Sequence, residues 1–244
     1  MNLDKLLGRR RVHYLHIGKT GGTAVKAALE AAAAPRRLRL LLHPHKVTLK
    51  DIPGTESCFF FVRDPMKRFV SGFYSRQRQG RPRHNWAWTP EEEAAFKLFP
   101  TPNALAVSLT SEDQALRQAA ADAMNSIRHV RDSLWRWLVD EAYLRTRRAS
   151  VLFVGSQEHL EQDFAALTQM LDVRAELPKD EVHAHRNPTD LDRRLEETAI
   201  QNLRRWYERD YACLDLLASW FPNLPAYSDE SAGPRPQIPA DQPT

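Results

Sequence analysis

A glycine-rich turn between an apolar run and a helix-forming run constrains the fold of this chain more than any other feature. The apolar run is residues 12–15, the turn is residues 18–23 (Gly-Lys-Thr-Gly-Gly-Thr), and residues 26–34 are mostly alanine. This order predicts a strand, a tight turn and a helix. Such a turn points backbone N–H groups and the positive end of the helix dipole at one spot. The sequence therefore predicts an anion site at the turn.

The side chains of the turn also suit phosphate binding. Glycine lets the backbone approach an anion closely, lysine adds a positive charge, and threonine adds a hydroxyl donor. The residues expected to hold the anion are Lys19, Thr20, Gly21, Gly22 and Thr23. The turn is not a Walker A loop, because that motif would place its first glycine at position 13, which is His13. An ordinary glycine turn with a solvated Lys19 is the alternative interpretation.

A second strand–helix joint follows the apolar residues 58–62. Their continuous hydrophobicity predicts a buried strand of a parallel sheet. Asp64 is a good N-cap and Pro65 suits the first helical position, so a helix is expected directly afterwards. Arg63 then lies at the carboxyl end of a strand, the edge where open α/β sheets bind ligands. Ser71 is expected about two turns into the helix.

Together these two segments resemble the sulfotransferases that use 3′-phosphoadenosine 5′-phosphosulfate (PAPS). The Lys-Thr-Gly-Gly-Thr turn resembles their 5′-phosphosulfate loop, and Arg-Asp-Pro with a serine in the next helix resembles their 3′-phosphate motif. The resemblance implies that Arg63 and Ser71 grip the 3′-phosphate. A guanidinium can bind phosphate in a bidentate way, which suits that role. Taken alone, Arg63 and Ser71 could equally be structural residues at a strand–helix joint.

Two histidines, His43 and His45, precede the second strand. A His-x-His sequence at this place resembles that of the sulfotransferases acting on heparan-type saccharides, in which one of the pair is the general base. His45 is the expected base, and His43 is expected to orient it or to replace it. Pro44 stands where better-known members have glycine, and surface histidines in a loop are the alternative. An ordinary histidine pKa near 6.5 suits proton removal at neutral pH.

Two weaker matches lie further along the chain. Residues 151–164 are expected to form a strand, a glycine turn and an amphipathic helix, with Glu158 in a structural role near a helix start. Residues 183–190 resemble the loop that closes over the cofactor in this family, which implies contacts from Arg186 and Thr189. A plain helix start is the alternative for that loop.

The fold expected is an α/β, P-loop-like parallel sheet flanked by helices, with a helical insertion over roughly residues 90–148. Residues 1–222 are expected to form one domain, and the proline-rich residues 223–244 a disordered tail. A last long helix is expected from about 190 to 220. The polar loop 77–90 is expected to line the acceptor cleft. Its Trp86 and Trp88 suit either sugar stacking or packing on the insertion.

Composition limits the function further. The net charge is +4, and the arginines gather before His43 and after Ser71, which favours anionic ligands. No nucleic-acid-binding motif accompanies them, so no nucleic-acid partner is expected. No apolar run reaches membrane-spanning length and no signal peptide is recognisable, so a cytoplasmic protein, a bacterial relative of anchored Golgi enzymes, is expected. The two cysteines and the histidine spacing indicate no metal site.

The function expected is transfer of a sulfuryl group from PAPS to an acceptor hydroxyl, with a saccharide or glycolipid preferred. The resemblance implies that Lys19 stabilises the leaving group and that no metal takes part. Two alternatives remain: a nucleotide-dependent phosphotransferase, and a non-catalytic protein that binds anionic glycans or nucleic acid. The sequence carries no signal of oligomeric state.

Overall fold

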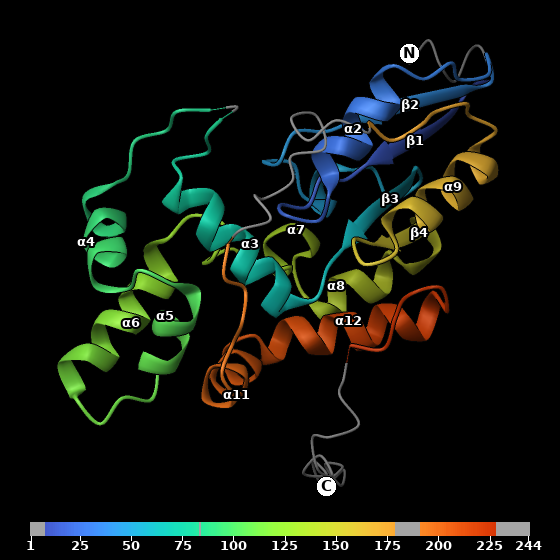
Figure 1. Ribbon diagram of the computed structural model, residues 1–244. Helices are drawn as coiled ribbons and strands as arrows, with labels where there is room; N and C mark the ends of the chain where they lie inside the picture. The colour runs from blue at the N-terminus through green and yellow to red at the C-terminus, as the bar shows by residue number, and fades with distance from the viewer. Residues whose placement is uncertain (1–7, 83, 179–190, 228–244) are drawn as a thin grey trace, which may run out of the picture.

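A parallel four-stranded sheet forms the centre of the computed structural model, which describes residues 8–82, 84–178 and 191–227 (Figure 1). Its strand order is β2-β1-β3-β4, and every neighbouring pair is parallel. The strands are β1 (Arg10–Tyr14), β2 (Leu38–Leu42), β3 (Ser57–Val62) and β4 (Val151–Ser156). The predicted α/β class with a parallel sheet is confirmed.

The apolar run of β3 supplies both faces of the sheet with core residues. Phe59 and Phe61 point to the face covered by α2 (Gly22–Glu30) and α9 (Leu160–Leu171). Alternate residues point to the opposite face, because side chains alternate along a strand. That face is covered by α7 (Trp135–Leu138), α8 (Glu141–Thr146) and α12 (Glu208–Trp220). A strand buried on both sides reads as a continuous apolar run, as β3 does.

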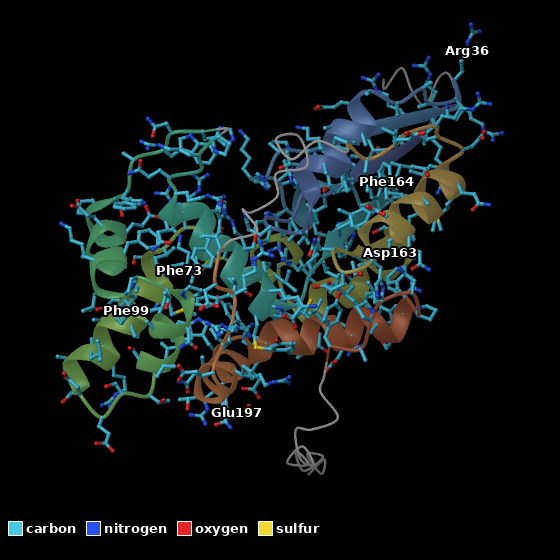
Figure 2. All side chains as sticks on the ribbon, viewed as in Figure 1. Arg36, Phe73, Phe99, Asp163, Phe164 and Glu197 are labelled. Carbon is cyan, nitrogen blue, oxygen red and sulfur yellow. The ribbon has the colours of Figure 1, made fainter. Side chains whose placement is uncertain are left out.

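A separate group of helices packs beside the sheet, around α3 (Figure 1). Phe73 and Phe99 lie within this group, whereas Phe164 of α9 lies against the sheet (Figure 2). Asp64 caps α3 by accepting a hydrogen bond from the Lys67 amide at 2.8 Å. The group consists of α3 (Pro65–Gln77), α4 (Pro90–Leu98), α5 (Pro102–Ser108), α6 (Gln114–Ser126) and α11 (Glu197–Trp206). The predicted helical insertion is therefore present.

Two predicted helices have different bounds. The first ends at Glu30, and residues 31–34 leave the helix, with Ala33 bridging to Arg174. The last helix begins at Glu197 rather than near 190 and is broken at Tyr207. That tyrosine is buried and donates a hydrogen bond to the Val130 carbonyl at 2.9 Å.

The segment after α12 packs along the edge of β4. Asn223 donates a hydrogen bond to the Val154 carbonyl at 2.9 Å, and Leu224 and Tyr227 are buried. Residues 223–227, at the start of the expected tail, are therefore ordered by contacts with the sheet. The rest of that segment, 228–244, lies outside the described residues.

Within the described part of the chain, the helices are all too short or too polar to cross a membrane.

Candidate functional site

The carboxyl ends of the four parallel strands meet at one large cavity of about 1640 Å³. Each strand is followed by a residue that lines it: Lys19 after β1, His45 after β2, Arg63 after β3 and Gln157 after β4. Open parallel sheets bind ligands at this edge. Residues far apart in the sequence are thus brought together by the topology of the sheet.

The loop between β1 and α2 has an unusual backbone. Lys19 has a φ of 67° and Gly21, the N-cap of α2, has a φ of 79°. Positive φ is uncommon for a residue with a side chain, and strained residues of this kind cluster at ligand sites. The turn leaves the first amides of α2 facing the cavity, which Gly21, Gly22 and Thr23 line. The predicted order of strand, tight turn and helix is therefore present, and the turn lies at the cavity.

Thr20 differs from its neighbours in the loop. It is fully buried, its hydroxyl donates a hydrogen bond to the Ile17 carbonyl at 3.0 Å, and it does not line the cavity. Its visible role is to hold the turn together.

Gly22 is needed because an aromatic stack lies against it. The His16 ring stacks between Tyr14 and His45, with ring centroids 5.4 and 3.7 Å away. A Cβ at Gly22 would come within 2.3 Å of the His16 ring and 2.6 Å of the Tyr14 hydroxyl. The stack thereby fixes the start of α2 relative to the end of β1. Burial lowers the pKa of His16 to about 3, with smaller effects of His45 and Lys26.

Arg63 links the second joint to the first. Its guanidinium donates a hydrogen bond to the Lys19 carbonyl at 3.4 Å, and its buried Nε has no hydrogen-bond partner among the described residues. Ser71 lies two turns along α3 and lines the same cavity. A buried guanidinium nitrogen without a partner leaves a donor for an anion.

Positive charge gathers around Lys19. Burial, followed by the charges of Arg63 and Arg78, lowers the pKa of Lys19 to about 7. An anion bound in the loop would oppose these effects and favour the ammonium form.

The two predicted histidines point to different places. His45 lines the cavity, and its Nδ1 lies 3.2 Å from the His16 carbonyl oxygen. Desolvation lowers the pKa of His45, and the charges of Arg128 and Lys19 act in the same direction. An Nδ1 proton donated to that carbonyl leaves Nε2 as the proton acceptor.

His43 instead begins a buried chain of polar groups. One ring nitrogen lies 2.8 Å from His13, whose other ring nitrogen lies 2.5 Å from Glu56. Glu56 also pairs with Arg11 at 3.0 Å. His43 does not line the cavity, so the structure brings only His45 of the pair to it.

Glu158 lies near the start of a helix, as expected, but that helix is α3 rather than the helix that follows Glu158 in the sequence. Its carboxylate accepts hydrogen bonds from the Asp64 amide and the Tyr227 hydroxyl, both at 3.2 Å. These contacts are compatible with the expected structural role, and Glu158 also lines the cavity. Arg186 and Thr189 lie outside the described residues.

The two tryptophans of the 77–90 loop have different surroundings. Trp86 lines the cavity, stacks on His84 with ring centroids 4.1 Å apart, and has the Arg128 guanidinium over its ring. Trp88 packs against Phe96, and its indole donates a hydrogen bond to the Arg76 carbonyl at 2.8 Å. Trp88 is therefore a packing residue, whereas Trp86 remains available at the rim of the cavity.

A buried ion pair holds this loop in place. Arg76 of α3 binds Glu92 of α4, with Nε and Oε1 2.8 Å apart, and also donates to the Trp86 and Ala87 carbonyls. Glu92 in turn accepts a hydrogen bond from the Arg128 amide at 3.0 Å. One ion pair thus joins α3, the loop and the segment after α6.

Sequence reasoning missed several basic residues that line the cavity, among them Arg128, His129 and Arg193. The first two follow α6, and the third precedes α11. They come from the helical group rather than from the strand ends, so no sequence motif predicts that they line the cavity.

The described residues contain no cluster of three or more histidine, cysteine, aspartate or glutamate side chains arranged to hold a metal ion. Cys58 and Cys213 are both buried and unbonded.

Comparison with known proteins gives one match. A model of the sulfotransferase family matches residues 6–216. No curated protein and no solved structure matches the chain.

Proposed function

The chain belongs to the sulfotransferase family, and we propose that it moves a sulfuryl group from PAPS to a hydroxyl group of a saccharide. One observation carries the proposal: the loop of Lys19, the Arg63–Ser71 joint and His45 all line one cavity at the carboxyl edge of the sheet. The donor has a phosphosulfate at one end of its ribose and a phosphate at the other. Two separate cationic anchors in one cavity suit such a molecule.

The residues of the cavity fit this donor chemically. The amides at the start of α2 and the Lys19 ammonium suit the 5′-phosphosulfate, because both favour negative charge. Arg63, with its unpartnered Nε, and Ser71 suit the 3′-phosphate. The cavity also carries apolar side chains, among them Leu160, Phe164 and Leu177. Surface of this kind suits a nucleobase.

PAPS supplies an activated sulfuryl group whose S–O bond to the phosphate breaks as a new S–O bond to the acceptor oxygen forms. His45 removes the proton of the acceptor hydroxyl, an effect that is typically worth about 10²–10⁴ in rate. Lys19 stabilises negative charge on the bridging oxygen that leaves with 3′-phosphoadenosine 5′-phosphate (PAP). Arg63 and Ser71 hold the far end of the donor and so keep the reacting atoms aligned.

Several features favour a saccharide acceptor. His45 stands at the place of the base in saccharide sulfotransferases, and the rim of the cavity carries Trp86 beside Arg128 and His84. Aromatic and cationic side chains together suit a polyhydroxylated, acidic ligand.

Incubation of the protein with ³⁵S-labelled PAPS and heparosan, chondroitin or dextran tests the choice of a saccharide acceptor. We expect label on an acidic polysaccharide, and label on none of the three counts against it.

Calorimetric titration with PAP, 5′-AMP and magnesium-ATP tests the donor. We expect PAP to bind at least about tenfold more tightly than 5′-AMP, because a charged hydrogen bond contributes roughly 1.5–3 kcal/mol. R63A should remove this preference. R37A is the matched control, because Arg37 is an exposed arginine that does not line the cavity. A preference for magnesium-ATP would instead support a phosphotransferase, and binding of PAP without transfer to any acceptor would support a binding protein.

A further inference from the structure

His129 lies in the same cavity as Lys19 and His45 but comes from the helical group. Its backbone has a φ of 71°, in the left-handed region that residues with side chains rarely adopt. Its side chain is only 17 % exposed. An imidazole held in this way needs surrounding structure that fixes it.

Two glycines make room for it. A Cβ at Gly72, in the middle of α3, would lie 3.2 Å from the carbonyl carbon, the carbonyl oxygen and the Cβ of His129. A Cβ at Gly18 would lie 4.0 Å from its Nδ1 and 3.2 Å from Trp137. Glycine is unfavourable inside a helix, so Gly72 has a packing reason for its place. The ring is thereby brought against the loop that carries Lys19.

The ring nitrogens of His129 have no hydrogen-bond partner among the residues that the structure describes. The nearest carboxylate oxygen of those residues, Asp132 Oδ2, lies 4.0 Å from Nδ1. That distance is too long for a hydrogen bond. The imidazole therefore has an N–H available for a ligand in the cavity.

The surroundings keep this imidazole neutral. Burial lowers the pKa of His129 to about 2, and the charges of Lys19, Arg128 and His45 act in the same direction. A neutral imidazole carries one N–H at every working pH and can donate it to an oxygen that bears negative charge. Lys19 and Arg128 attract such an oxygen to the same place.

We infer that His129 donates a hydrogen bond to a sulfuryl oxygen of the bound donor and thereby positions the group for transfer. This inference rests on the proposed function. PAP lacks the sulfuryl group but keeps both phosphates, so the two nucleotides separate this contact from the rest of the donor site.

Calorimetric titration of PAPS and PAP into the wild type, H129G and H129N tests the inference without any acceptor. Glycine and asparagine both tolerate the left-handed backbone, and asparagine keeps an N–H donor. We expect H129G to bind PAPS roughly tenfold or more weakly and PAP within about twofold of the wild type. H129N should recover most of the affinity for PAPS. R37A is the control, because Arg37 is exposed, does not line the cavity and should affect neither ligand.

Three results would overturn the inference. Equal weakening of PAPS and PAP by H129G would give His129 a purely structural role. Unchanged affinity for both would mean that the imidazole touches neither. Failure of the wild type to bind either nucleotide would overturn the proposed function itself. The hydrogen bond from His129 to the sulfuryl group would then be excluded as well.

Discussion

Gly22 and His16 fit together with no room for a methyl group between them, since a Cβ at Gly22 would lie 2.3 Å from two atoms of the His16 ring. The contact joins the amino-terminal end of α2 to the segment that leads from β1 to Lys19. The start of the helix, and with it the direction of its free amides, is therefore set by the packing of His16.

G22A should disrupt this loop. The added methyl group must displace His16 or the start of α2, and overpacking of this kind costs about 1–3 kcal/mol. We expect a lower melting temperature and PAP binding weakened by tenfold or more. G54A is the control, because the nearest atom to a Cβ there lies 3.9 Å away. Normal PAP binding by G22A would show that the loop does not depend on the contact.

Ser71 and Ser75 offer a matched pair one turn apart on α3, and both line the cavity. If Ser71 contacts the 3′-phosphate, S71A should reduce the preference for PAP over 5′-AMP several-fold, because one hydrogen bond to a charged group is lost. S75A should leave that preference unchanged. Titration of both nucleotides into both variants measures it, and the reverse pattern would assign the contact to Ser75.

His45 and His43 should differ in turnover. H45N should reduce transfer by about 10²–10⁴ while PAP binding stays within twofold, since only His45 lines the cavity. H43N should instead lower stability, because it breaks the buried chain through His13 to Glu56. Because the pKa of His45 is lowered, its imidazole stays deprotonated at pH values below 6.5. The fall of kcat/KM on the acid side of the pH profile should therefore occur below pH 6.5. An acid limb that survives in H45N would assign the base elsewhere.

Lys19 should take up a proton when the donor site fills. Its pKa is about 7 in the free protein, so at pH 8 most Lys19 is neutral, and a bound anion raises the pKa and draws a proton in. The affinity for PAP should therefore fall as the pH rises above 7. Calorimetry at pH 8 in buffers of different ionisation enthalpy measures the uptake. K19M should abolish it, and an equal uptake in K19M would place the titrating group outside this loop.

Acid should destabilise the fold through its buried histidines. The pKa of His16 is lowered to about 3 and that of His129 to about 2, so the unfolded chain binds protons below pH 6.5 that the folded chain does not. Above pH 6.5 both histidines are neutral in the folded and the unfolded chain, so the free energy of unfolding does not change with their titration. As the pH drops from 6.5 towards 3, each group lowers the free energy of unfolding by about 1.4 kcal/mol per pH unit. Thermal unfolding from pH 7.5 to 4.5 should show this loss. H129N should make the slope shallower, whereas H159Q, at an exposed histidine, should not.

The strand–loop–helix joints could be predicted because their signals are local. A continuous apolar run predicts β3, and Asp64 with Pro65 predicts the start of α3. Both elements are present in the structure. The long final helix was wrong because its apolar period continues through Tyr207. At the break, the Tyr207 side chain is buried and hydrogen-bonds the Val130 carbonyl, a long-range contact that the local pattern does not encode.

The helical side of the cavity could not be predicted in the same way. His129 shares the cavity with Lys19 because the segment after α6 lies against Gly72 of α3, and no spacing in the sequence encodes that approach. One signal was present: Gly72 interrupts an otherwise good helix directly after Ser71, which indicates close approach by another segment. The pairing of Trp88 with Phe96 likewise depends on where α4 lies.

Helix α3 carries Ser71 and Gly72 in its middle and Arg76 near its end, and Arg63 lies just before it. Each residue along a helix turns by about 100°, so inserting or deleting one residue between Ser71 and Arg76 would swing the arginine away from Glu92. The loop that Arg76 holds would then lose its anchor, although every motif residue remained. The spacing between Ser71 and Arg76 is thus fixed by the helical repeat of α3.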